Sequence, residues 1–342
     1  MVVMRWRAVG AAMALGLAVA GCASTADEGQ SNNSVKGKAI TLIVPNQPGQ
    51  GMDTYARMIA PYLKDCLGAS RLTVKNETGA GGVLGTNSLW HSKPDGQTIE
   101  FTSITAITLA ALADLEGVAY KPTEFVYLGR AAAEPRVFTA GKDSGIKSVD
   151  DLRNLSESDP FIYPSPGTDQ DFFLAAVLAE SVGFPLKMIT GFEGQGDATL
   201  AIQKGEASGQ VWAYSVGKPF IDSGEQIPLL VTSKERMAEL PDVPTAIELV
   251  DDPVALEAFA EVNDYHRGFF GPPNLSPELT KKFRDGVACA LSNEELVEKA
   301  EKAQLPVDAL GGEELQTAIE DLYPEMEEIL PPIFKKALES IQ

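Results

Sequence analysis

Short apolar runs alternate along the chain with segments in which apolar residues recur every three or four positions. The run at residues 40–44 is followed by Tyr55, Ile59 and Leu63 at helical steps. Further β-rich runs occupy residues 72–75, 98–102, 161–163, 209–213 and 227–231. Residues 172–182 form a strongly apolar helical pattern, and the chain beyond residue 278 is helical and acidic. Strand, loop and helix repeated in this way predict an α/β fold of mostly parallel sheets flanked by helices.

The N-terminus has the pattern of a bacterial export signal. Arg5 and Arg7 precede an apolar run at residues 8–20, which is shorter than the roughly 20 residues needed to span a membrane. Residues 17–22, Leu-Ala-Val-Ala-Gly-Cys, resemble the lipobox of bacterial lipoproteins, which implies cleavage before Cys22 and acylation of its sulfur. We predict a signal peptide over residues 1–21 and a flexible tether over residues 22–37, which are rich in Ser, Asn and Gly. The mature protein is expected outside the cytoplasm, lipid-anchored to the bacterial cell membrane.

Composition and charge narrow the function. The chain has 342 residues, 28 Lys and Arg against 48 Asp and Glu, and a formal charge of −20. That length suits about two domains, and the charge argues against a nucleic-acid partner. An acidic chain can still bind an anion, because backbone N–H groups need no net positive charge. With two histidines, no zinc-ligand spacing and no nucleophile motif, we expect no metal, no cofactor and no enzymatic activity.

Two cysteines remain in the predicted mature domain after Cys22. Cys66 and Cys289 both fall in predicted helices, one near each end of that domain. Outside the cytoplasm they could form a disulfide that closes a loop of more than 200 residues. The alternative is two separate buried thiols that behave as small apolar side chains. The sequence leaves both possibilities open.

Three glycine-rich loops, at residues 45–51, 76–82 and 164–169, each follow a strand and precede a helix. Glycine lets a ligand approach the backbone closely, and the helix that follows offers unpaired N–H donors. This pattern predicts a site for a carboxylate or a phosphate. A nucleotide is poorly supported, because Thr54 stands where a dinucleotide fingerprint has Gly or Ala and residues 79–85 lack the Gly-Lys-Ser/Thr ending of a P-loop.

The motifs also resemble those of the periplasmic receptors of tripartite tricarboxylate transporters, often called Bug proteins. The resemblance covers nearly the whole mature chain and is carried by residues 43–45 with Pro48, Gly49, Gly51 and Asp53; Asn76 with residues 79–82 and Gly85; residues 94–96 and 192–194; Gly205; residues 240–245 with Glu248; and residues 268–272. It implies a two-lobed periplasmic-binding-protein-like fold of type II that closes over a small carboxylate. This chain departs from the family pattern at Asn46, Gln47 and Gln50, and at Asp169 in the third loop.

The candidate ligand-binding residues lie in the three loops and beside them. They are Asn46, Gln47, Pro48, Gly49, Gln50, Gly51 and Asp53; Gly79, Ala80, Gly81 and Gly82; Ser103; Ser165, Gly167, Thr168 and Asp169; and Tyr214.

Several of these residues have a structural alternative. Asp53 could instead cap its helix, Ser103 could satisfy turn amides, and one of Trp212 and Tyr214 is expected in the core and the other at the pocket. An acidic Asp169 at the pocket would repel a carboxylate unless it points outward or pairs with a cation.

We therefore expect a monomeric solute-binding receptor. It would capture a small organic anion, a di- or tricarboxylate, and deliver it to integral membrane transporter subunits. One lobe is predicted from residues 38–104 plus 226–342 and the other from residues 105–225. The alternatives are an anchored extracellular enzyme such as a hydrolase, or a ligand-sensing ectodomain.

Overall fold

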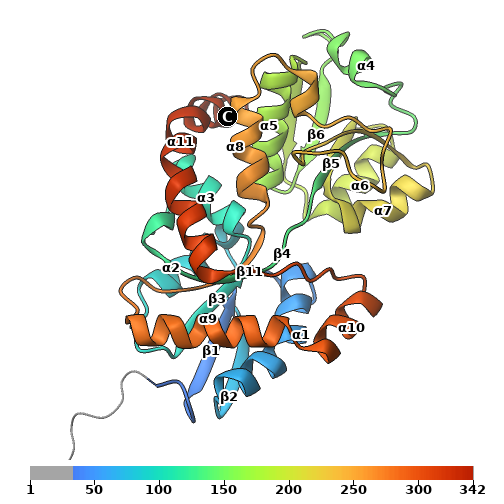
Figure 1. The fold of residues 1–342 in the computed structure, drawn as a ribbon. Coiled ribbons are helices and arrows are strands. Elements are labelled where there is room, and N and C mark those ends of the chain that lie inside the picture. The colour runs from blue at the N-terminus through green and yellow to red at the C-terminus, as the bar shows by residue number, and fades with distance from the viewer. Residues whose placement is uncertain (1–33, 342) are drawn as a thin grey trace, which may run out of the picture. The chain divides into compact units, whose positions relative to one another are not determined.

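The computed structural model describes residues 34–341 (Figure 1). The predicted signal peptide, Cys22 and most of the predicted tether lie outside this range. The strands are β1 (Ala39–Val44), β2 (Arg71–Asn76), β3 (Thr98–Thr102), β4 (Val126–Ala132), β5 (Arg136–Gly141), β6 (Phe161–Ser165), β7 (Leu186–Thr190), β8 (Gly209–Ala213), β9 (Gln226–Val231), β10 (Arg267–Gly271) and β11 (Leu310–Gly311). The helices are α1 (Gly51–Leu67), α2 (Val83–Trp90), α3 (Ile104–Leu112), α4 (Val149–Arg153), α5 (Gln170–Val182), α6 (Gln195–Gln203), α7 (Tyr214–Asp222), α8 (Val254–Asn263), α9 (Pro277–Leu291), α10 (Glu294–Lys302) and α11 (Gly312–Glu339), with short 3-10 turns η1 (Ala80–Gly82), η2 (Pro122–Glu124) and η3 (Ile247–Leu249).

A six-stranded sheet has the order β11-β4-β10-β3-β1-β2. β1 pairs in parallel with β2 and with β3, so that Leu42 lies beside both Val74 and Ile99. The loops that leave these three strands therefore emerge at the same edge of the sheet. The strands expected from the sequence are found as β1, β2, β3, β6, β8 and β9, which are distributed over all three sheets of the structure. Their bounds differ from the expected ones by at most a few residues.

Two smaller sheets complete the described chain. β8-β5-β9 is antiparallel and β6-β7 is parallel. The expected parallel pairing thus holds for β1 to β3 and for β6 with β7, whereas β10 runs antiparallel to both β3 and β4. β4 thus has the direction of β3 and leads the chain out of the six-stranded sheet, and β10 runs the other way as it brings the chain back.

The predicted lobe boundaries at residues 105 and 226 do not match the change of sheet. β4 belongs with β3, and β9 belongs with β5, so the chain crosses between the sheets at residues 133–135 and 264–266. The extended segments at 101–105 and 226–230 include strands inside the sheets and are not connections between them. In addition, one apolar core contains Ile107, Phe172 and Leu315, so residues 105–225 share a continuous core with the rest.

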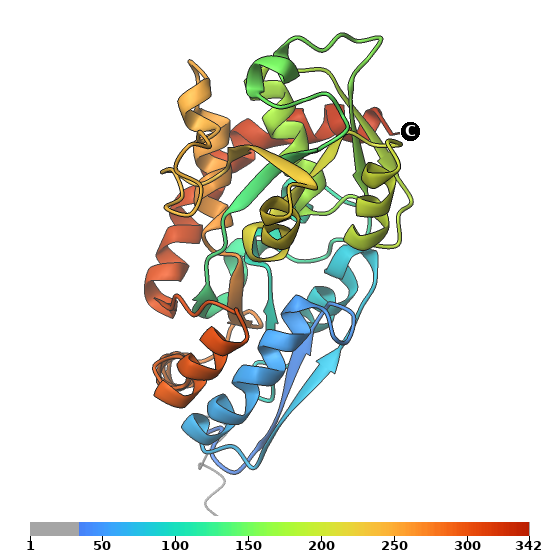
Figure 2. The same cartoon turned by 90° about the vertical axis from the view of Figure 1, so that its right-hand side faces the viewer.

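A second apolar core lies between the six-stranded sheet and the pair α1 and α9. Leu42 and Phe101 from the sheet meet Ile59 of α1 and Phe283 of α9, all fully buried. Figure 2 shows α1 lying along β1 and β2. A disulfide joins Cys66 of α1 to Cys289 of α9, whose Cα atoms are 6.1 Å apart and whose sequence separation is 223. Of the two possibilities that the sequence left open, the paired one is found.

The predicted tether ends earlier than residue 37. Val35 is completely buried in the second core, and the Gly37 N–H donates to the Gly68 carbonyl at 2.8 Å. Val35 is an isolated apolar residue in a polar segment, so the sequence gave little indication that it would be buried in the core.

The C-terminal helix α11 begins beside β4 and then packs against α8 and α5 (Figure 1). Its apolar positions, among them Leu315, Ile319 and Phe334, are buried, while Glu313, Glu320 and Glu328 are exposed. The acidic residues of this helix thus form its solvent-exposed face.

Candidate functional site

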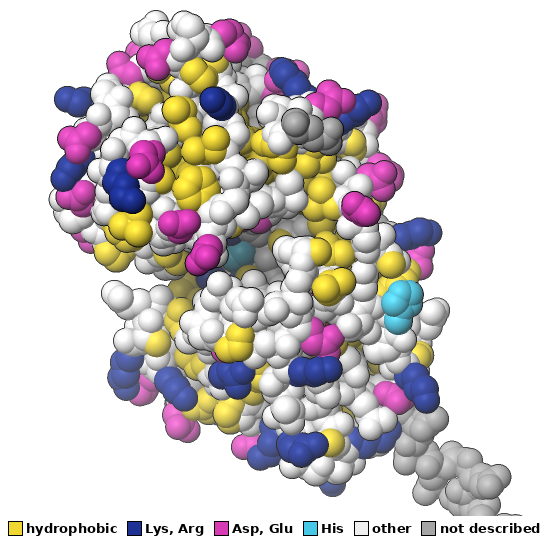
Figure 3. All heavy atoms as spheres, turned by 180° about the vertical axis from the view of Figure 1, so that it is seen from behind, with side chains coloured by type: hydrophobic (Ala, Val, Ile, Leu, Met, Phe, Trp, Pro, Cys, Tyr) yellow, Lys and Arg dark blue, Asp and Glu magenta, His cyan; other side chains and the backbone are white. Residues whose placement is uncertain are grey.

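The first two glycine-rich loops leave β1 and β2 at the same edge of the six-stranded sheet, and Ser103 follows β3 at that edge. Open α/β sheets bind ligands at the carboxyl ends of their parallel strands. In the space-filling view, the face in Figure 3 is hollowed across its middle. The structure thus brings the first two loops and Ser103 to one edge.

Asp53 fastens these two loops together. Its carboxylate accepts from Gly49 N at 2.7 Å, from Arg57 Nε at 2.9 Å and from Asn76 Nδ2 at 2.8 Å. The same Asn76 amide donates to the Asn46 carbonyl at 2.9 Å. The Arg57 hydrogen bond, together with those from Gly49 and Asn76, lowers the pKa of Asp53 to about 2 against the effect of burial. A lowered pKa means that ionised Asp53 stabilises the fold at neutral pH and loses this effect only in strong acid.

Asp53 is not the N-cap of α1. The N-cap is Gln50, whose side chain makes no capping hydrogen bond. Gly49 and Asn76 donate to the Asp53 carboxylate from the two loops and Arg57 from α1, so this carboxylate holds the two loops together. Of the two roles that the sequence offered for Asp53, the N-cap is not found, and ligand contact stays a prediction.

The second loop adopts a backbone that requires glycine. Gly79, Gly81 and Gly82 have φ values of 139°, 65° and 105°, and Ala80 between them has 47°. Four successive residues in this region are unfavourable for most side chains. At Gly81 a Cβ atom would meet nothing within 4 Å, so the space beside this residue is open.

The helices that follow the loops differ in how they begin. Within the described chain, α1 and α2 have no side-chain cap, although both start at the glycine-loop edge. By contrast, Ser103 caps α3 through Ala106 N, and Asp169 caps α5 through Phe172 N at 2.9 Å. At α1 the uncapped start leaves N–H donors available to an anion. At α2, Gly82 N and Leu84 N already donate to the Gly79 carbonyl, at 3.0 and 3.4 Å.

The third predicted loop is largely satisfied by its own contacts. Ser165 is fully buried, donates to the Gly167 carbonyl at 2.5 Å and accepts from Gly167 N. The side chain of Asp169 is used as the helix cap, and burial and the neighbouring Asp171 raise its pKa. Ser165, Gly167 and Asp169 are therefore held by local contacts, and a role for them or for Thr168 in ligand binding stays a prediction.

A buried polar cluster, which the sequence did not reveal, connects Ser103 to the start of α5. The side-chain amide of Gln170 is oriented with its nitrogen toward Ser103 and its oxygen toward Arg136. The nitrogen donates to Ser103 Oγ at 2.6 Å, and the oxygen accepts from Arg136 Nε at 3.0 Å. Ser103 Oγ lies 2.9 Å from Nδ1 of His266. Burial, followed by the charges of Arg136 and Arg267, lowers the pKa of His266 well below its usual value, so the ring is neutral at pH 7.

Two ion pairs border this cluster. Arg136 Nε lies 3.2 Å from Asp171 Oδ1, and Arg267 pairs with Glu134. The Arg267 guanidinium also lies 4.4 Å above the centre of the Tyr55 ring of α1. These four charged side chains are all buried. Glu134, Arg136 and Arg267 lie in or next to the two connections between the sheets, and Asp171 lies in the first turn of α5.

Trp212 and Tyr214 occupy different surroundings. Trp212 is in the core, where its Nε1 donates to Gln226 at 2.8 Å and its ring stacks on Phe220. Tyr214 is half-buried against a small apolar cluster that includes Val137, Val231 and Met237. The expected core position of one aromatic residue is found at Trp212. The Tyr214 contacts are those of a packing residue, and its predicted ligand contact remains untested.

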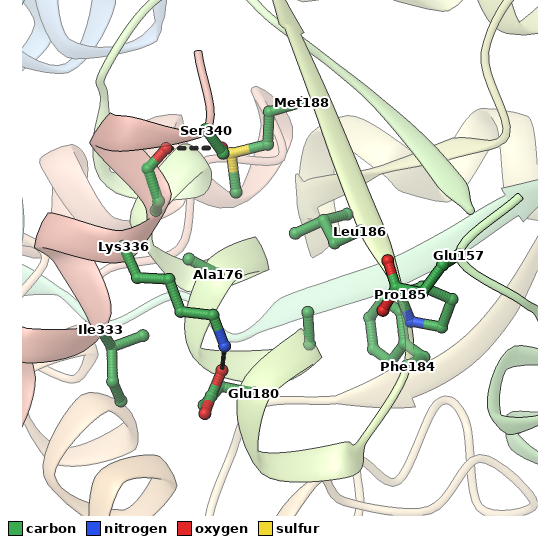
Figure 4. A pocket seen from close by; sticks show the side chains of 12 residues that line it. Glu157, Ala176, Glu180, Phe184, Pro185, Leu186, Met188, Ile333, Lys336 and Ser340 are labelled. Atoms are coloured by element: carbon green, nitrogen blue, oxygen red, sulfur yellow. Dashed lines mark hydrogen bonds and ion pairs between the residues drawn. The ribbon is translucent and has the colours of Figure 1, made fainter. Parts of the chain in front are cut away.

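Another pocket, of about 200 Å³, lies between α5, β7 and α11 (Figure 4). It is lined by apolar side chains such as Phe184 and Met188, with the pair Lys336 and Glu180 at 2.5 Å. None of the predicted site residues lines it. Among residues 34–341 there is no group of three potential metal ligands and no helix with the length and apolar character to cross a bilayer.

Comparison with known proteins relates this geometry to a described family. Residues 55–330 match the family described as tripartite tricarboxylate transporter family receptor. Protein BugT of Bordetella pertussis is 29% identical over 224 residues, covering 64% of this chain and 68% of the relative. A UPF0065 protein of Agrobacterium vitis is 27% identical over 274 residues, which are 79% of this chain and 76% of that relative.

Solved structures of similar fold include the periplasmic binding protein BugD, with a TM-score of 0.67, 22% identity, and coverage of 89% of this chain and 99% of BugD. MatC from Rhodopseudomonas palustris with bound malate has a TM-score of 0.65, 21% identity, and coverage of 87% and 99%. An R. palustris protein with adipate has a TM-score of 0.66, 21% identity, and coverage of 88% and 97%. These likenesses confirm the predicted periplasmic-binding-protein fold.

Proposed function

The chain belongs to the tripartite tricarboxylate transporter receptor family, and from this premise we propose that it binds a small di- or tricarboxylate at the glycine-loop edge. A member of a receptor family is not an enzyme, in agreement with the sequence prediction and against the alternative of a hydrolase. A tripartite transporter as the partner is favoured over a signalling protein because the family carries that transporter's name.

The uncapped starts of α1 and α2 support carboxylate binding most directly. Both helices begin where the first two loops leave the sheet, and neither has a side chain that accepts its N-terminal N–H groups. A ligand carboxylate between the start of α1 and residues 79–81 would accept backbone N–H groups there, and charge-assisted hydrogen bonds are the strongest available to it. Because Asp53 holds the two loops, this site is formed before the ligand arrives.

The far end of the ligand has a second set of partners in Ser103, Gln170 and His266, with Arg136 beside them. Asp169 would not repel a second carboxylate, because its side chain caps α5. The malate of MatC and the adipate of its relative are both dicarboxylates, which suits a site with two separated groups of donors.

Ligand capture would involve closure about the two connections between the sheets, at residues 133–135 and 264–266. Two crossing connections are the usual hinge of such receptors, since only a few backbone angles need to change. In this proposal the loaded, closed receptor delivers its ligand to integral membrane transporter subunits. An extracytoplasmic location follows from the export signal and the family.

Replacing Gly81 with Val should reduce ligand affinity at least tenfold. The side chain would enter open space beside the second loop, where it would block the approach of a carboxylate, and φ at this position is +65°. A thermal-shift screen with malate, adipate and citrate would select the ligand, because a ligand that binds the folded state stabilises it. Calorimetric titration of the folded variant would then give its affinity.

Gly205→Val is the matched control. Gly205 has a φ of +75° and equally open surroundings, but it follows α6 and lies in none of the three loops. The control should bind normally, which separates backbone strain from site geometry. Unchanged affinity in folded Gly81→Val would mean that the glycine loops are only structural turns.

We also propose that Cys22 carries the lipid anchor. Cys22→Ala should leave the precursor unprocessed or release the protein from the membrane fraction, because two acyl chains give stable attachment where one gives a marginal one. Fractionation of cells and mass spectrometry of the mature N-terminus would measure both outcomes. Membrane association of an unlipidated wild-type protein that persists in about 0.5 M salt would contradict the assignment.

A further inference from the structure

Charge is distributed very unevenly along this acidic protein. Residues 34–104 contain seven basic residues (Lys and Arg) and five acidic ones (Asp and Glu). Residues 105–342 contain 19 basic and 41 acidic residues. Two of the five acidic residues in the first segment, Asp53 and Glu100, are buried. The surface formed by residues 34–104 is therefore basic on a chain whose formal charge is −20.

Folding gathers several of these scattered basic residues around the amino ends of β1, β2 and β3. Lys64 and Arg71 line one groove between α1 and β2, and the Lys36 side chain lies next to Gly68, which ends α1. Lys93 is in the loop that leads into β3, and this loop is bonded to β1 through the Gln97 carbonyl. We refer to Lys36, Lys64, Arg71 and Lys93 as the basic pole. In Figure 3, Lys and Arg side chains gather along the lower part of the face, below the hollow.

Acidic neighbours only partly offset this charge. Asp65 pairs with Lys64 at 2.8 Å, and Asp95 accepts from both the backbone and the side chain of Gln97. Lys36, Arg71 and Lys93 are exposed. These three side chains of the basic pole therefore present positive charge to the solvent.

The basic pole is at the edge of the sheet opposite the glycine loops, because β1, β2 and β3 are parallel. It is also where the described chain begins, next to the buried Val35. Twelve residues separate Cys22 from Val35, which allow a span of at most about 45 Å. A lipid on Cys22 would therefore keep this pole within a short distance of the bilayer.

We propose that the basic pole binds the anionic headgroups of the membrane and orients the receptor with its glycine-loop edge away from the lipid. Lys and Arg side chains near an anionic leaflet are attracted to it. Attraction and repulsion are both screened beyond about 10 Å at moderate salt, so the acidic remainder of the protein opposes this contact only weakly. The proposal draws on the proposed lipid anchor only for local concentration, and it is independent of the ligand.

Co-sedimentation with vesicles tests the contact without the anchor. The probe is the chain that lacks residues 1–22, since residues 34–341 form one compact unit. It should sediment with vesicles of equal parts phosphatidylglycerol and phosphatidylcholine, and not with phosphatidylcholine alone. About 0.5 M salt should release it, because the Debye length becomes shorter than 5 Å.

The triple variant Lys36→Glu, Arg71→Glu and Lys93→Glu should reduce this partitioning at least tenfold. Thermal unfolding would verify that the variant is folded.

The control variant is Lys187→Glu, Lys204→Glu and Lys335→Glu, which has the same total charge and changes exposed lysines elsewhere. It should partition like the wild type. Equal losses in the two variants would show that only total charge matters and would overturn the proposal. A wild-type protein that does not prefer anionic vesicles would also overturn the proposal. In that case the basic residues would serve to keep the exposed edge strand β2 from pairing with other chains.

Discussion

Removal of the Cys66–Cys289 disulfide should lower the melting temperature by about 10 °C. The bond closes a loop of more than 200 residues, and for that length the chain-entropy relation gives a stabilisation of about 5 kcal/mol. In a protein of this size, each kcal/mol shifts the melting temperature by about 2–3 °C. Calorimetric scans of the double variant Cys66→Ser and Cys289→Ser would measure the shift.

A reducing agent provides the control for this measurement. It should lower the melting temperature of the wild type toward that of the double variant and leave the double variant unchanged. If the reduced wild type melted at the same temperature as the oxidised one, the disulfide would contribute nothing to stability. Such a result would indicate that packing of α1 against α9 is sufficient to hold these helices together.

Replacing Glu134 with Gln should reduce the free energy of unfolding by about 3 kcal/mol. Glu134 pairs with Arg267, and both side chains are at most 6% exposed. Loss of the carboxylate would leave a buried guanidinium without a counter-charge, which is far more costly than loss of an exposed pair. Burial alone would raise the pKa of Glu134. Arg267, Ser215 and Arg136 nevertheless hold this pKa below its usual value, so the pair is ionised at neutral pH. Urea unfolding would give the difference.

Glu248→Gln is the matched control for this substitution. Glu248 forms an ion pair with Arg236 at 2.6 Å, but both side chains are about 40–45% exposed. An exposed pair contributes at most about 1 kcal/mol. If the two variants lost similar amounts, burial would not determine the strength of the Glu134 pair.

The sequence predicted the parts of the site that depend on local chemistry. A glycine-rich segment between a strand and a helix indicates both a turn and an exposed helix start, and the second loop indeed needs glycine at Gly79, Gly81 and Gly82. The strands before these loops were equally evident from their apolar runs. These features are encoded by neighbouring residues, so one sequence is enough to recognise them.

The buried polar cluster could not be predicted in the same way. Ser103, Arg136, Gln170 and His266 come from four separate segments, and no spacing between them forms a motif. The only signal was chemical, since Arg and His are rarely buried in a core without polar partners. The lobe boundaries failed for a related reason: an extended segment looks the same in sequence whether it lies within a sheet or connects two sheets.

The role of Asp169 depends on contacts that the sequence does not reveal. Its acidity predicted repulsion of an anionic ligand unless it points outward or pairs with a cation. In the structure the carboxylate accepts from Phe172 N and fills the place that a ligand carboxylate would take at this helix. In the proposed site, the far end of a ligand would therefore depend on Ser103 and its neighbours.

The position of β10 in the six-stranded sheet also has a consequence for how the protein folds. This strand lies between β3 and β4, yet it follows β4 in the chain by roughly 130 residues. During synthesis from the N-terminus, β3 and β4 have no partner to join them until Arg267–Gly271 emerges, and such distant pairings form late. The chain thus remains without a central strand of this sheet during most of its synthesis, and the sheet can be completed only after residues 267–311 have joined the rest.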